Sequence, residues 1–99
     1  MVERKIVWSH RANIRLYAIL EFYTERNGSN AYSAKIYRKF NQELRLLLKQ
    51  TDIGVTTTME DIRGLIVDDF ILYYETAEQF IIVHTVWDTR QDPDALVIK

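Results

Sequence analysis

Apolar and polar positions alternate in short runs along the second half of the chain. Residues 62–67, 70–75 and 80–88 are rich in β-branched and aromatic residues, and short polar segments separate these runs. Such runs are typical of neighbouring antiparallel strands. The pattern predicts a three-stranded meander, with a two-residue turn at Asp68-Asp69 and a second turn over residues 76–79.

The first half of the chain predicts one short strand, over residues 2–8, and two helices. Ser9 is a suitable N-cap for the first helix, which Asn27-Gly28 ends, and Ser29 or Asn30 can cap the second. Residues 51–59 read as a loop. The apolar stripes at helical spacing are Ala12, Leu16, Ile19, Leu20 and Tyr23 in the first helix, and Ile36, Tyr37, Phe40, Leu44, Leu47 and Leu48 in the second.

These elements predict a single α+β domain over residues 1–99, in the order β-α-α-β-β-β. Because the link between the helices is short, they form a hairpin, which is expected to cover one face of a small antiparallel sheet. The chain has 99 residues and no cysteine, so a disulfide and a thiolate metal site are excluded. Its N-terminus has too few consecutive apolar residues for a signal peptide or a membrane span, which predicts a cytoplasmic protein.

Charge is distributed unevenly although the net charge is only -1. The first 50 residues hold ten Lys and Arg against four Asp and Glu, whereas the remaining residues hold three against ten. Any polyanion should therefore meet the helices. The outer face of the second helix lacks interleaved aromatic residues, which favours a solvated face over a nucleic-acid site. Its basic residues are Lys35, Arg38, Lys39, Arg45 and Lys49.

Cross-strand pairing with even turns assigns each strand residue to one of two faces, and both faces are apolar. The helices can cover only one. Its residues are Arg63, Leu65, Val67, Phe70, Leu72, Tyr74, Ile81, Val83, Thr85 and Trp87. The second face would expose an apolar patch that indicates a partner site, unless the register is wrong or the tail at Leu96-Val97-Ile98 covers it. This face carries Ile66, Ile71, Tyr73, Phe80, Ile82 and Val86, together with His84 and Asp88.

The chain resembles the RelE/ParE superfamily of bacterial toxins from type II toxin-antitoxin pairs, also called plasmid stabilisation proteins. The resemblance covers nearly the whole chain and combines several segments with the order of elements. These segments are Ile6-Val7-Trp8-Ser9 before an alanine-containing helix, Ile62-Arg63 before a strand, Phe70-Ile71-Leu72-Tyr73-Tyr74, and the ending Val86-Trp87-Asp88-Thr89-Arg90-Gln91-Asp92-Pro93.

This resemblance implies a toxin that a cognate antitoxin wraps and blocks, and an exposed apolar face suits such a partner. The same face would allow the chain to form a homo-oligomer when the antitoxin is absent. The expected partner-binding residues are Ile66, Ile71, Tyr73, Phe80, Ile82 and Arg90.

The two branches of the superfamily differ in target. RelE-like members cleave mRNA on the ribosome with basic residues, one of which falls where this chain has Ile71. Cleavage through a 2′-hydroxyl needs a proton acceptor, a proton donor and positive charge, and that set is largely missing here. ParE-like members act on DNA gyrase without being enzymes, and the chain looks more like this branch. The alternatives are a divergent ribosome-dependent endoribonuclease and an inactive antitoxin-binding member.

Three residues are weak catalytic candidates, and each also has a structural explanation. His84 is in the middle of a strand, where a hydrogen-bonded histidine is the more common case. Arg90 is expected to pair with Asp88 or Asp92, and Arg63 with Glu21 or Glu25. The two histidines lack metal-ligand spacing, so no metal or other cofactor is predicted. Trp8 and Trp87 are expected in the core.

Overall fold

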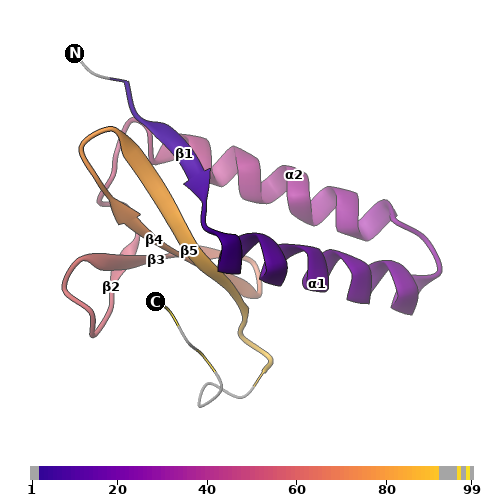
Figure 1. Cartoon of the computed structure of the whole chain (residues 1–99). Helices are drawn as coiled ribbons and strands as arrows, with labels where there is room; N and C mark the ends of the chain where they lie inside the picture. The colour runs from indigo at the N-terminus through magenta and orange to yellow at the C-terminus, as the bar shows by residue number, and fades with distance from the viewer. Residues whose placement is uncertain (1–2, 92–95, 97, 99) are drawn as a thin grey trace.

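The computed structural model describes residues 3–91, Leu96 and Ile98, and it has two layers, a helical hairpin packed on one face of a mixed sheet (Figure 1). The predicted α+β class and the order of elements are confirmed. The elements are β1 (Lys5–Trp8), α1 (His10–Asn27), α2 (Ala31–Leu46), β2 (Val55–Thr56), β3 (Ile62–Val67), β4 (Phe70–Thr76) and β5 (Phe80–Asp88).

Both ends of α1 follow the capping signals of the sequence. Ser9 has an extended backbone, and its Oγ accepts a hydrogen bond from the backbone N–H of Ala12 at 3.1 Å. Gly28 ends the helix with φ of 66°, a left-handed conformation that glycine adopts without steric cost. The chain then turns directly into α2, which makes the two helices antiparallel neighbours.

The second helix differs from its prediction at one position and at its end. Tyr37 was placed in the buried stripe, but its side chain is 46% exposed. Its neighbour Ile36 is buried and takes the core-facing position. The helix ends at Leu46, and Leu47 follows in a turn yet is completely buried. Ser33, which the apolar pattern did not include, is also buried, and its Oγ donates to the Leu20 carbonyl of α1 at 2.7 Å.

The sheet has the strand order β1-β5-β4-β3-β2. The meander of β3, β4 and β5 is antiparallel as predicted, and Val67 pairs with Phe70 across the Asp68-Asp69 turn. Two details differ from the prediction. β1 is an edge strand that joins the meander from outside, as expected, but it pairs parallel to β5 in a sheet that was predicted to be antiparallel. Within the segment expected to be a loop, β2 adds a two-residue edge strand against Arg63 and Gly64.

A β-bulge between β4 and β5 overturns part of the predicted assignment of faces. Tyr74 pairs with Val83, but its neighbour Tyr73 pairs with Thr85, so His84 is an extra residue on β5. The extra residue reverses the facing of every later residue of the strand. Val86 therefore joins the core below the helices and Trp87 turns to the second face, the opposite of the prediction.

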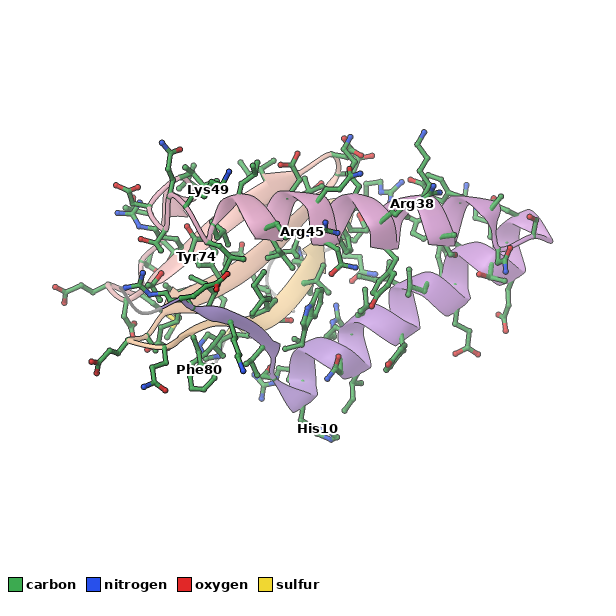
Figure 2. All side chains as sticks on the ribbon, turned by 90° about the horizontal axis from the view of Figure 1, so that it is seen from above. His10, Arg38, Arg45, Lys49, Tyr74 and Phe80 are labelled. Carbon is green, nitrogen blue, oxygen red and sulfur yellow. The ribbon has the colours of Figure 1, made fainter. Side chains whose placement is uncertain are left out.

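The core lies between the hairpin and the sheet, and the hairpin extends beyond the sheet at the end where α1 meets α2 (Figures 1 and 2). Trp8 packs against this core as expected, partly buried. The buried residues of the cluster are Ala12, Leu16, Ile19, Tyr23, Ile36, Phe40, Leu44, Leu47, Leu65, Val67, Phe70, Leu72, Tyr74, Ile81, Val83 and Val86.

Candidate functional site: the open sheet face and a groove beside α1

The second face of the sheet is partly exposed, in agreement with the idea of a partner site there. Ile66 is 59% exposed and Phe80 is 40% exposed, whereas Ile71, Tyr73 and Ile82 are half-buried. Burial raises the pKa of the Tyr73 hydroxyl above its ordinary value. Neither α1 nor α2, the helices of the described residues, covers this face, so the exposed hydrophobic surface of these side chains is available to another polypeptide.

Other parts of the same face are closed. Trp87 is buried, and the Arg15 guanidinium of α1 lies 5.2 Å from its ring centroid. Val86, which was expected in the exposed patch, is buried in the core because of the bulge. Ile98 of the tail lines a cavity with His84, while Val97 lies outside the described residues.

His84 is a paired strand residue, as its structural explanation predicted. Its Nε2 lies 2.8 Å from Glu75 Oε1 across the bulge, and both side chains are mostly buried. Its backbone carbonyl accepts from Ser9 Oγ at 3.0 Å. The imidazole is thus held against a carboxylate of the neighbouring strand and away from the other two catalytic candidates.

Arg63 does not pair with Glu21 or Glu25. Its Nη1 instead donates to the carbonyl oxygens of Gly54 at 2.9 Å and Asp52 at 3.3 Å. Its strand partner Tyr74 holds the same loop, since the tyrosine hydroxyl donates to the Thr51 carbonyl at 2.8 Å and accepts from the Gly54 N–H at 3.0 Å. Arg63 is therefore part of a clamp on the segment between α2 and β2.

Arg90 forms the ion pair with Asp88 that was expected as its structural explanation. Nε and Nη2 of the guanidinium lie 2.8 and 2.9 Å from the two carboxylate oxygens of Asp88, and the Arg90 N–H also donates to Asp88 at 3.0 Å. Tyr23 donates to the same carboxylate at 3.0 Å and also contacts Arg90 Nη2. Asp92, the alternative partner, lies outside the described residues.

A groove beside α1 was not anticipated from the sequence. It encloses about 380 Å³ between α1 and the residues after β5. Arg90 forms part of its wall beside α1, whereas the exposed residues with which it had been grouped lie on the second face of the sheet. The lining residues are Arg15, Ala18, Ile19, Phe22, Tyr23, Arg26, Asp88, Arg90 and Gln91.

A sequence signal for this groove exists in the spacing of α1. Ala18, Phe22 and Arg26 follow one another at intervals of four and therefore share one face of the helix. That face is adjacent to the buried stripe, and Phe22 is 54% exposed. The signal is that Ala18 and Phe22 are apolar but lie outside the core stripe of α1.

The described residues do not combine into a familiar catalytic arrangement. His84 lies on the second face, Arg63 pairs with a core-facing tyrosine, and Arg90 lies beside α1. Within the described ranges there is no group of three or more His, Asp or Glu residues that could hold a metal ion. No helix in this part of the chain is long and apolar enough to span a bilayer.

Comparison with solved structures finds the same fold in toxin-antitoxin proteins. The chain matches "Chromosomal ParDE TA system from P. aeruginosa" with a TM-score of 0.72 and 16% identity, over 85% of this chain and 94% of the other. It also matches a crystal structure of YafQ from E. coli strain BL21(DE3), with a TM-score of 0.54, 12% identity and coverage of 88% and 94%. Comparison with curated proteins gave no match.

The family comparison is more specific than these structural similarities, which show the fold alone. Residues 6–93 match the model of the ParE toxin of the type II toxin-antitoxin system parDE. This range contains all the helices and nearly all of the sheet. The chain therefore belongs to the ParE toxin family of type II toxin-antitoxin systems.

Proposed function

We propose that this protein is a toxin that acts by binding DNA gyrase and that a cognate antitoxin neutralises it. The match of residues 6–93 to the ParE toxin family carries this proposal. The three catalytic candidates also favour binding over catalysis. His84, Arg63 and Arg90 each have a structural partner, and in the described part of the chain they line different cavities.

The antitoxin is proposed to cover the second face of the sheet. Ile66 and Phe80 are exposed there, and an uncovered apolar face of a small domain is a suitable surface for a partner. Ile71, Tyr73 and Ile82 would lose their remaining exposure on binding. A solved structure with the same fold is a chromosomal ParDE toxin-antitoxin system, which supports the existence of a partner.

The cellular target can be tested by expressing the protein under an inducible promoter. Gyrase binding predicts filamentation and a DNA-damage response, and the purified protein should inhibit supercoiling by gyrase. A ribosome-programmed mRNA assay is the matched control. Abrupt loss of translation together with mRNA cleavage would replace the gyrase proposal with the endoribonuclease alternative. Normal growth with no effect in either assay would indicate an inactive member.

The antitoxin proposal is tested through the gene next to this one. Co-expression of a small neighbouring protein should give a stoichiometric complex and restore growth. Hydrogen exchange should then show slower exchange of the Tyr73 and Phe80 amides in the complex than in the free chain. A complex that leaves these amides unchanged would contradict the proposed location, although the pairing itself would stand.

A further inference from the structure

The groove beside α1 has the features of a ligand site that the proposed function does not use. It is a cavity with a volume of about 380 Å³, and it lies between α1 and the end of β5. Its floor is apolar, formed by Ala18, Ile19 and the rings of Phe22 and Tyr23, which meet edge to face at 5.0 Å. A concave apolar surface with a few converging polar groups is the common form of a binding pocket.

The polar groups of this groove are mainly cationic. Among the described residues, three arginines line it and Asp88 is the one acidic residue, which leaves a net charge of +2 for this set. Asp88 is already engaged by Arg90 and Tyr23. Neither Arg15 nor Arg26 has an ion pair with any residue in the described part of the chain.

The guanidinium of Arg15 is held in place, and most of its donors make no hydrogen bond to another described residue. It lies 5.2 Å from the centre of the Trp87 ring, and Nη2 makes a long hydrogen bond of 3.4 Å to Gln91 Oε1. An arginine has five N–H donors and can bind a carboxylate through two of them. A cation positioned this way loses little conformational entropy on binding an anion.

We propose that this groove binds an acidic segment of a partner protein, with one apolar side chain in the cavity and flanking carboxylates on Arg15 and Arg26. Charge complementarity and the apolar floor together select this occupant. A phosphate backbone would satisfy the arginines but would leave Phe22 and Ala18 without an apolar contact. The inference rests on the proposed function only in requiring a protein partner.

The test uses the purified full chain and a fluorescein-labelled peptide of sequence Glu-Leu-Glu-Trp-Glu-Leu-Glu, followed by fluorescence anisotropy. A second peptide has Gln in place of every Glu. The acidic peptide should bind about tenfold more tightly than the Gln peptide, since its charge-assisted contacts with Arg15 and Arg26 together are expected to contribute about this much. The double substitution Arg15→Gln and Arg26→Gln should lower the affinity for the acidic peptide by about tenfold or more.

The matched control is Arg38→Gln, because Arg38 is an exposed arginine on the other helix and does not line the groove (Figure 2). This variant should bind the acidic peptide within about twofold of the wild type. Arg90 is left unchanged because its loss would disturb Asp88. Circular dichroism of all variants verifies that each remains folded.

Three outcomes would overturn the inference. One is equal affinity for the acidic and Gln peptides. Another is that Arg38→Gln lowers the affinity for the acidic peptide as much as the double variant does. The third is a short oligothymidylate that displaces the peptide and itself loses affinity in the double variant, since the arginines would then serve nucleic acid. Growth arrest and gyrase inhibition are measured separately on the same variants, so failure of the gyrase proposal does not affect the peptide result.

Discussion

Asp88 is the residue on which the end of β5 depends. It is 7% exposed, and it accepts hydrogen bonds from the backbone and side chain of Arg90 and from the hydroxyl of Tyr23. A buried carboxylate is stable only with such partners. The ion pair therefore connects α1 to the chain beyond the sheet, and Arg90 is positioned by it before it meets any ligand.

Asp88→Asn tests this role. The amide keeps the shape of the side chain but loses the charge and turns a donor toward Arg90, so we expect the free energy of unfolding to fall by about 2 kcal/mol. Urea unfolding measures the change. Asp69→Asn, at an exposed carboxylate of the neighbouring turn, should cost less than about 0.5 kcal/mol. Equal effects of the two substitutions would mean that the network adds no stability.

Two adjacent tyrosines give the protein a specific alkaline response. Burial raises the pKa of Tyr73, and burial is also the largest cause of the raised pKa of Tyr74. Above pH 10 the unfolded state releases these protons before the folded state does. The free energy of unfolding should therefore be unaffected near neutral pH and fall as the pH rises beyond 10. Tyr73→Phe should flatten this fall in urea titrations at increasing pH, and an unchanged slope would contradict the assignment.

At the scale of elements, Ser9 joins α1 to the bulge in β5. Its hydroxyl accepts from the Ala12 N–H and donates to the carbonyl of His84, the extra residue of the bulge. The sequence predicts the cap from the residue type and its place before a helix. The second hydrogen bond joins residues 75 positions apart and follows only from the assembled sheet.

Ser9→Ala should destabilise the protein by about 1–2 kcal/mol, because the helix cap is lost and the His84 carbonyl loses its partner. Thermal unfolding provides the measurement. Ser9→Thr, which keeps the hydroxyl, is the control and should recover most of the loss. If alanine and threonine lower the melting temperature equally, the hydroxyl is not the stabilising group.

The bulge also marks the limit of what the sequence predicts about the sheet. Strand positions follow from runs of β-branched and aromatic residues. The faces of Glu75 and Ile82 follow as well, but a turn over residues 76–79 implies that Glu75 pairs with Phe80, whereas it pairs with Ile82. The alternation across Val83, His84 and Thr85 is compatible with a regular strand, so nothing local indicates the extra residue. One residue of shift then moves Val86 to the face below the helices and Trp87 to the second face, where Trp87 is still buried as expected.

The candidate sites also differ in how far the sequence predicts them. The exposure of Ile66 and Phe80 is predicted from the sequence pattern, because two helices can cover only one of the two apolar faces of the sheet. The groove beside α1 forms only when the end of β5 packs against α1. The residues that line it from α1 and from the end of β5 are more than 60 positions apart in the sequence, so no local pattern predicts it. Charge, by contrast, is visible in the sequence, and the groove lies on the basic helical half.

At the scale of the whole molecule, the two proposed surfaces are formed by different residues. The sheet face is apolar and the groove is cationic, so one partner would need different segments to reach both, and two partners could bind independently. The exposed sheet face also gives the free chain a way to associate with itself. This self-association should depend on Ile66 and Phe80 and not on the apolar residues exposed on α1.

Replacing both Ile66 and Phe80 by lysine tests this separation. Both side chains are exposed, so the free energy of unfolding of the double variant should be within about 1 kcal/mol of the wild-type value. Sedimentation velocity of the free chain should show less self-association for this variant, because apolar area is removed and positive charge repels a second copy. Ile14→Lys with Tyr17→Lys adds the same charge at exposed positions of α1 and should leave self-association nearly unchanged. An equal reduction by both variants would attribute the effect to net charge and remove the evidence for a specific sheet surface.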